Sequence, residues 1–155
     1  MYLIKKLILY IYSIFYIYIG IKHFINSNFF YLIIPPFIPF KNFIIYFTGI
    51  IEITGGLLII FKKFRTFGSY IIIFLLIIVF PANIYIVVSK NIQEVVNLSF
   101  SGSLIRSFFQ IPLILVASWF RYDKMNNFAE LFYVIISIIT IIYFLTLWSK
   151  RKKQL

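Results

Sequence analysis

Five long apolar stretches constrain the fold of this chain more than any other sequence feature. They cover about residues 3–22, 43–61, 70–88, 104–121 and 131–149. Each is close to the ~20 residues that a helix needs to cross the hydrocarbon core of a bilayer. The runs are continuous instead of alternating, which argues against membrane β-strands, and backbone groups in lipid must bond within their own segment. We therefore expect an all-α integral membrane protein.

Composition supports the same class. The 155 residues are 63% hydrophobic and 12% charged, whereas a soluble domain is about half apolar and about a quarter charged. The net charge is +11, but the basic residues lie in small groups at the ends of the apolar runs. This pattern is typical of membrane flanks and not of a nucleic-acid surface. The expected partner is the lipid bilayer, with no nucleic acid.

Lysine and arginine also predict the orientation. The first run lacks the small-residue cleavage site of a signal peptide, so we interpret it as a retained span. If the N-terminus is cytoplasmic, seven basic residues of the first four spans and their connections lie on that side and three lie on the other, with Arg106 near the boundary. Because cytoplasmic loops carry the excess of positive charge, we expect a cytoplasmic N-terminus. The heavy use of Ile, Phe, Tyr, Lys and Asn is typical of an AT-biased bacterial genome, so the expected location is a bacterial inner membrane.

The fifth run does not follow this charge rule. A full crossing would place a basic tail on the outer side, made of Lys150, Arg151, Lys152 and Lys153. We therefore predict a four-helix transmembrane bundle over residues 1–122. Residues 123–155 would add an accessory fifth C-terminal hydrophobic helix, transmembrane or interfacial, with a basic tail. The side of the C-terminus stays open.

A single carboxylate lies in the middle of the second run. Glu52 is the only charged residue between Phe43 and Phe61, and insertion of an acid at the centre of a membrane helix costs about 2.5–3.5 kcal/mol. Gly49, Gly55 and Gly56 lie three or four residues from it, so the helix has one small, polar face. Small faces let helices approach closely, and we expect this face to point into the bundle.

Four more polar side chains are expected in the same outer half of the membrane. With a rise of 1.5 Å per residue, they come from the ends of the first, third and fourth runs: His23, Asn83, Arg106 and Gln110. Together with Glu52 they predict a polar pocket that binds a cofactor or ligand. Glu52 and His23 are the candidate proton-exchange groups, and no catalytic residue is assigned.

Each of these residues also has a purely structural interpretation. Glu52 could pair with His23 or Arg106, and Asn83 and Gln110 could hydrogen-bond between helices. The sequence contains no cysteine, which excludes thiol chemistry within the chain, and one histidine with one nearby glutamate falls short of a zinc set. No metal site is predicted.

Prolines and polar segments predict where the helices are interrupted. Residues 31–40 hold three prolines, so a broken or non-helical segment is expected there. Pro81 should kink the third span. A short basic turn is expected at residues 62–69, and a polar loop with a Ser-Gly-Ser turn at residues 90–103.

Several short segments, taken in order, resemble the DoxX family. They are Gly-Ile-Lys-His-Phe at 20–24, Ile-Pro-Pro-Phe-Ile-Pro at 34–39, Thr-Gly-Ile-Ile-Glu-Ile-Thr-Gly-Gly at 48–56, Phe-Pro-Ala-Asn-Ile-Tyr at 80–85, and the stretch from 106 to 119. The resemblance covers about residues 5–122 and implies a small bacterial membrane protein with a four-helix bundle. The fifth helix departs from the family pattern, as do Ser107, Phe108 and Phe109.

The sequence features and the resemblance together lead to two expected functions of different classes. DoxX takes its name from a subunit of a membrane thiosulfate:quinone oxidoreductase, so the first expectation is a membrane subunit that binds a quinone-like, lipid-soluble molecule in the polar pocket. The alternative is a non-enzymatic assembly or stabilising partner, in contact with other membrane subunits or with further copies of itself. Whether the chain is an enzyme stays open, and a transporter is disfavoured because no inverted repeat is visible.

Overall fold

The computed structural model describes the backbone of residues 2–152 and the side chains of residues 2–147. Within this range the structure is helical and contains no strand. The helices in chain order are α1 (Tyr2–Ile25), α2 (Ser27–Ile33), α3 (Lys41–Ile60), α4 (Arg65–Ile78), α5 (Phe80–Val88), α6 (Lys90–Val96), α7 (Phe100–Phe108), α8 (Gln110–Trp119) and α9 (Asn127–Lys152).

Five helical segments of the described range are long and apolar enough to cross a membrane. They are Tyr2–Ile25, Lys41–Ile60, Arg65–Val88, Phe100–Trp119 and Asn127–Leu147. The all-α class and the five apolar helices are thereby confirmed. The domain boundary at residue 122 stays a prediction. Of the predicted basic tail, Lys153 lies outside the described residues, as do the side chains of residues 148–152.

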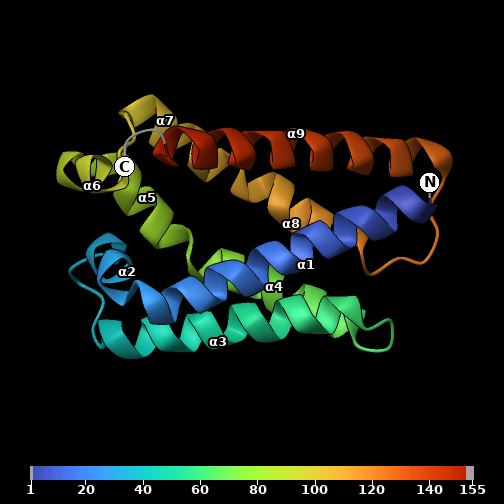
Figure 1. Cartoon of the computed structure of the whole chain (residues 1–155), viewed down its shortest axis with the longest axis horizontal. Coiled ribbons are helices and arrows are strands. Elements are labelled where there is room, and N and C mark those ends of the chain that lie inside the picture. Colours follow the sequence, from blue (N-terminus) through green and yellow to red (C-terminus); the bar gives the residue numbers. More distant parts are fainter. Residues whose placement is uncertain (1, 153–155) are drawn as a thin grey trace.

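The five long spans follow one another in alternating directions (Figure 1). The main packing partners are α1 with α3, α3 with α4, α4 with α8, and α8 with α9. The short helices α2 and α6 lie at one end of the molecule, on the left in Figure 1. The N-terminus and the turn between α3 and α4 lie at the opposite end. The central core is formed where α1, α3, α4 and α8 meet, and it includes Trp119 and Phe120.

Small residues let α1 and α3 pack closely. A Cβ atom on Gly20 would lie 2.7 Å from the backbone oxygen of Gly49, and one on Gly56 would lie 2.9 Å from the backbone oxygen of Ser13. Gly55 faces Ile72 of α4 instead. The predicted small face of the second span does point into the bundle, and it contacts two neighbouring helices.

Two of the spans are broken within their length. The third span divides between α4 and α5 at Val79, two residues before Pro81, which confirms the predicted kink. The fourth divides between α7 and α8 at Phe109, three residues before Pro112. Proline has no backbone N–H and removes a helical hydrogen bond. The second break was not predicted, although its cause is the same.

The predicted connections are more helical than expected. Residues 27–33 form α2, so only residues 34–40 of the proline-rich segment are non-helical. The predicted Ser-Gly-Ser turn is wrong, because residues 101–103 lie in α7, whose N-cap Ser99 accepts a hydrogen bond from the Gly102 N–H at 3.2 Å. Likewise Gly68 and Ser69 belong to α4 and not to a turn.

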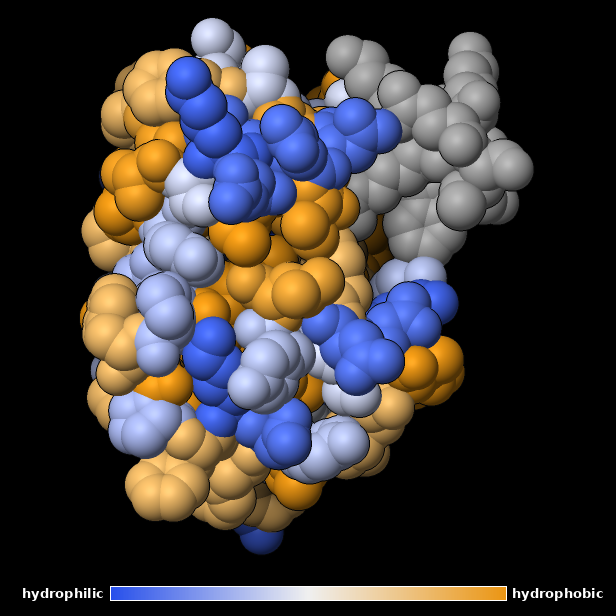
Figure 2. Space-filling view, turned by 90° about the vertical axis from the view of Figure 1, so that its left-hand side faces the viewer, coloured by the Kyte–Doolittle hydropathy of each residue, from blue (hydrophilic) through white to orange (hydrophobic). Residues whose placement is uncertain are grey.

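The outer surfaces of the spans are largely apolar. Among the exposed large side chains are Leu7 and Ile14 of α1, Phe74 of α4 and Ile142 of α9. Figure 2 views the end that carries α2 and α6, where hydrophilic residues gather between hydrophobic ones. The apolar sides and the more polar end are the pattern that a membrane-crossing bundle requires.

Candidate functional site

The structure brings His23 and Glu52 together between α1 and α3. The Nε2 atom of His23 lies 3.3 Å from Oε2 of Glu52, and the two residues are 8% and 9% exposed. Close packing of the helices creates this contact, because a Cβ atom on Gly49 would lie only 2.8 Å from the Cβ atom of His23. The pairing of these two residues was one of the sequence interpretations.

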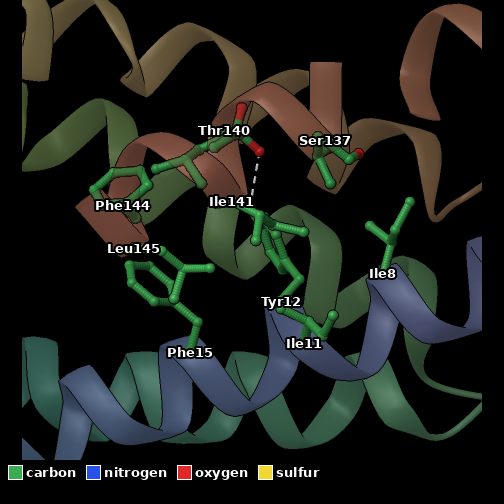
Figure 3. A pocket seen from close by; sticks show the side chains of 11 residues that line it. Ile8, Ile11, Tyr12, Phe15, Ser137, Thr140, Ile141, Phe144 and Leu145 are labelled. Carbon is green, nitrogen blue, oxygen red and sulfur yellow. Dashed lines mark hydrogen bonds between the residues drawn. The ribbon is translucent and has the colours of Figure 1, made fainter. Parts of the chain in front are cut away.

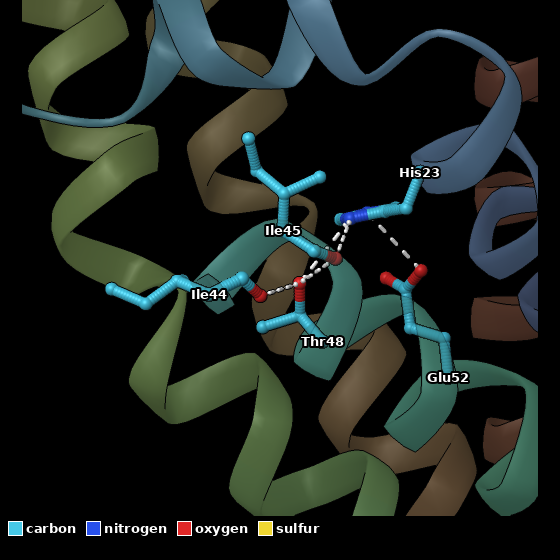
Figure 4. Close-up of polar contacts among 5 residues, drawn as sticks. All are labelled: His23, Ile44, Ile45, Thr48 and Glu52. Carbon is cyan, nitrogen blue, oxygen red and sulfur yellow. Dashed lines mark hydrogen bonds and ion pairs between the residues drawn. The ribbon is translucent and has the colours of Figure 1, made fainter. Parts of the chain in front are cut away.

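The backbone of α3 fixes the orientation of the imidazole ring (Figure 4). The Nδ1 atom of His23 lies 2.9 Å from the carbonyl oxygen of Ile45 and 3.2 Å from Oγ1 of Thr48. Thr48 itself donates its hydroxyl proton to the carbonyl of Ile44 at 2.8 Å. Since a carbonyl oxygen only accepts, Nδ1 carries a proton and donates it to Ile45. The other ring nitrogen, Nε2, is left facing Glu52.

This arrangement leaves one proton position between the imidazole and the carboxyl group. Either a neutral imidazole accepts from a carboxylic acid, or an imidazolium donates to a carboxylate. The 3.3 Å contact has the distance of an ion pair. It is not aligned as a hydrogen bond, and within the described part of the chain Oε2 has no hydrogen-bond partner. Buried polar atoms are normally satisfied, and Oε2 lacks the hydrogen-bond partner that such an atom usually has.

Aromatic side chains enclose the pair. Phe30 of α2 stacks on the His23 ring, with centroids 3.7 Å apart and an interplanar angle of 26°. Tyr16, two helical turns before His23, is buried and close enough to Glu52 for the charges of the two groups to interact. Tyr12 lies one turn before Tyr16 on α1, and the hydroxyl groups of the two residues are 3.5 Å apart. Polar groups therefore continue from Glu52 into the core along α1.

Asn83 and Gln110 form a second polar group at the two helix breaks. The Asn83 amide Nδ2 donates to Oε1 of Gln110 at 2.9 Å, and Nε2 of Gln110 donates to the carbonyl of Leu76. The Ser107 hydroxyl adds a contact of 3.3 Å to the Asn83 carbonyl. The amides thus connect the break between α4 and α5 to the break between α7 and α8, which supports their structural interpretation as interhelical hydrogen bonds.

The five predicted site residues are thus placed in more than one group. His23 pairs with Glu52 and Asn83 pairs with Gln110, and these pairs involve different helices. Arg106 is half-buried on α7, near enough to Tyr143 of α9 for its charge to act on the phenol. A single pocket shared by all five residues stays a prediction.

Sequence reasoning did not identify Thr48 and Phe30 as parts of the site. Thr48 lies four residues before Glu52, so helical spacing alone places both on one face. Phe30 had no sequence signal, because its position depends on how α2 folds back over α1. Within the described residues, no group of three or more His, Cys, Asp or Glu side chains is arranged to hold a metal ion.

Comparison with known families gives one match. A family model described as a domain of unknown function, DUF8561, matches residues 12–121. The matched range includes His23, Glu52, Asn83, Arg106 and Gln110 and ends before α9. No curated protein and no solved structure matches the chain.

Proposed function

We propose that this chain, which belongs to the DUF8561 family, is a multi-pass protein of the bacterial inner membrane that binds a small, quinone-like molecule beside His23 and Glu52. The membrane part of the proposal is supported by the five apolar helices and by the large side chains exposed on their outer faces. Such faces are stable when hydrocarbon covers them.

We further propose a cytoplasmic N-terminus. Because the spans alternate in direction, the start of α1 with Lys5 and Lys6 lies at the same end of the bundle as residues 62–65 (Figure 1). Lys22, Lys41 and Lys90 lie at the other end. The first end has the larger number of basic residues in its short connections, and positive charge favours the cytoplasmic side. His23 then lies near the outer surface, and Glu52 lies deeper in the outer half.

The observation that carries the ligand proposal is the unsatisfied Oε2 atom of Glu52 beside a histidine of fixed orientation. A ligand hydroxyl could donate to Oε2 when Glu52 is ionised, and a ligand carbonyl could accept the proton when the carboxyl group carries it. The molecule should be lipid-soluble, because the surroundings are aromatic and aliphatic. A quinone combines both features. The resemblance to the DoxX family supports the same ligand class, since it rests partly on the segments around His23 and Glu52.

Asn83, Arg106 and Gln110 have a secondary place in this proposal. The Asn83 and Gln110 amides already bond to each other and to the backbone of α4. They would shape the site by holding the broken helices in position, and Arg106 would contribute its charge from α7. A ligand head group reaching these residues would have to displace existing hydrogen bonds.

The test is to purify the full chain in lipid nanodiscs, extract the bound lipids for mass spectrometry, and titrate the protein with a short-chain ubiquinone. We expect a co-purifying quinone and an affinity that falls about tenfold or more in Glu52→Gln, the equivalent of one hydrogen bond of about 1.4 kcal/mol. Glu94→Gln makes the same chemical change at an exposed position and should bind normally. Equal affinity in the two variants would contradict the proposal.

A second candidate function, an assembly partner for other membrane subunits, is favoured by α9. Only 17% of the residues in its apolar window are buried, against 39% for α1 and α3. This helix therefore has the most uncovered apolar surface to offer a neighbouring subunit or a second copy of the chain. Pull-down in mild detergent distinguishes the two functions, because a stoichiometric partner that is lost when α9 is deleted supports assembly.

A further inference from the structure

A cavity of about 140 Å³ lies between α1, α8 and α9, away from the His23–Glu52 pair (Figure 3). It forms because α9 presents small side chains to the bundle at Ser137 and Thr140, both of which are buried. One side of the cavity is closed by the rings of Phe15 and Phe144, whose centroids are 5.3 Å apart. The floor is provided by Leu113 and Val116 of α8.

The cavity offers no free hydrogen-bond donor among the described side chains that line it. Three lining residues carry hydroxyl groups, and each donates its proton to a backbone carbonyl. Tyr12 donates to Leu113 at 2.8 Å, Ser137 to Tyr133 at 2.7 Å, and Thr140 to Ile136 at 2.7 Å. The other lining residues are Ile, Leu, Val and Phe. A polar ligand would therefore lose hydrogen bonds to water without replacing them here.

The cavity lies about halfway along both α1 and α9. Tyr12 is ten residues from the start of α1, and Ser137 is ten residues from the start of α9, which corresponds to about 15 Å along each helix. The rim includes Ile11 and Leu145, which are 39% and 62% exposed. In the proposed membrane placement, these apolar rim residues face lipid chains and not head groups.

We infer that this cavity binds a segment of a hydrocarbon chain that enters from the bilayer between α1 and α9. Apolar cavities of ~150 Å³ stay dry and accept a benzene-sized apolar group, so the volume suits part of a chain and not a whole lipid. An acyl chain and an isoprenoid tail share this chemistry. The inference depends on the membrane placement proposed above but not on ligand binding at His23.

The experiment uses photocrosslinking of the full chain in vesicles. One set of vesicles contains phosphatidylcholine with a diazirine in the middle of an acyl chain, and the other contains a diazirine-bearing isoprenoid alcohol. We expect mass spectrometry to find label on Leu113 or Val116, which are 8% and 2% exposed and which lipids on the outer surface do not reach. The probe that labels them identifies the source of the chain.

Filling the cavity should block this labelling. Ser137→Leu places a larger side chain in the space and should reduce label on α8 about tenfold, the equivalent of about 1.4 kcal/mol of lost binding. Ile138→Leu, on an exposed position of the same helix, should leave it unchanged. Thr140→Leu serves as a second filling variant if Ser137→Leu does not fold.

Two further results separate this inference from the proposed function. His23→Gln should leave the labelling of α8 intact even if it abolishes quinone binding, because the cavity does not include that residue. Two results would overturn the inference. One is the absence of label on α8 with both probes. The other is label on α8 that persists in both filling variants while the outer face of α9 is labelled normally.

Discussion

At the scale of single residues, the state of the His23–Glu52 pair depends on one backbone carbonyl. Ile45 holds the Nδ1 proton of His23 at 2.9 Å, and this directs Nε2 towards the carboxyl group. A histidine without that bond could turn its other nitrogen towards Glu52. The pair is buried, so its interaction should respond little to salt and should not behave as two independent groups.

The coupling within this pair can be measured by a double-mutant cycle. We expect His23→Gln and Glu52→Gln to show an interaction free energy of about 0.5–3 kcal/mol, obtained from thermal or denaturant unfolding in detergent. The coupling should be the same at low and high salt. Additive effects would show that the two side chains do not share a proton or a hydrogen bond.

Residue-level prediction from the sequence was partly successful. Glu52 was recognised because a carboxylate in an apolar run is costly, and its depth left His23 and Arg106 as the two candidate partners. The rise per residue predicts how deep a side chain lies along its helix. It does not predict how the helix is rotated about its axis, and therefore not which neighbouring helix the side chain faces. For this reason the sequence left open whether Asn83 and Gln110 share a pocket with Glu52 or hydrogen-bond between helices, and the structure shows the hydrogen bond between their amides.

At the scale of elements, close helix contacts and helix breaks position the site. The contact of α1 with α3 requires glycine where the backbones meet. Pro81 was visible as a kink, while the break before Pro112 and the helices within residues 90–103 were not predicted. Local signals explain the two helices within residues 90–103. Ser99 caps the start of α7, and Asn97 ends α6 with a left-handed backbone at φ 54°.

Gly49→Ala should be strongly destabilising. The new Cβ atom would lie 2.8 Å from the Cβ of His23 and 3.0 Å from the backbone oxygen of Gly20, and neither atom belongs to the flexible end of a side chain. Overpacking of this kind costs about 1–3 kcal/mol. Gly102→Ala is the control, because the nearest atoms to its new Cβ are 3.5 Å away. Similar melting temperatures for both variants would contradict the close packing of α1 and α3.

Gln110→Leu should loosen the connection between the two helix breaks. The substitution leaves Asn83 Nδ2 and the Leu76 carbonyl without their partner, and an unsatisfied buried group costs about 1–3 kcal/mol. Adding Asn83→Leu removes the unpaired amide and should recover part of the loss in unfolding free energy. If the double variant is less stable than Gln110→Leu alone, the two amides do not act as a pair.

At the scale of the whole molecule, the order of the apolar runs predicted the fold class and the sequence of spans well. Length and hydropathy are sufficient for that prediction, since lipid leaves the backbone few alternatives to a helix. They do not determine how helices pack laterally. The cavity beside α9 is an example, because it depends on which face of that helix is turned towards α1.

The proposed orientation can be tested directly because the chain contains no cysteine. Lys63→Cys and Glu94→Cys place single thiols at exposed positions on opposite ends of the bundle. In intact spheroplasts, a membrane-impermeant maleimide should label Glu94→Cys and not Lys63→Cys. Lysed membranes provide the control, since both thiols should react there. The reverse pattern would place the N-terminus outside.

The aromatic cover of the buried pair also has a consequence for substitutions made far from it. Phe30, which stacks on the His23 ring, packs with residues of α5 and α6 around Ile86 and Ile92 in a second hydrophobic cluster. A substitution that repacks this cluster therefore reaches the imidazole through Phe30, without changing either member of the pair.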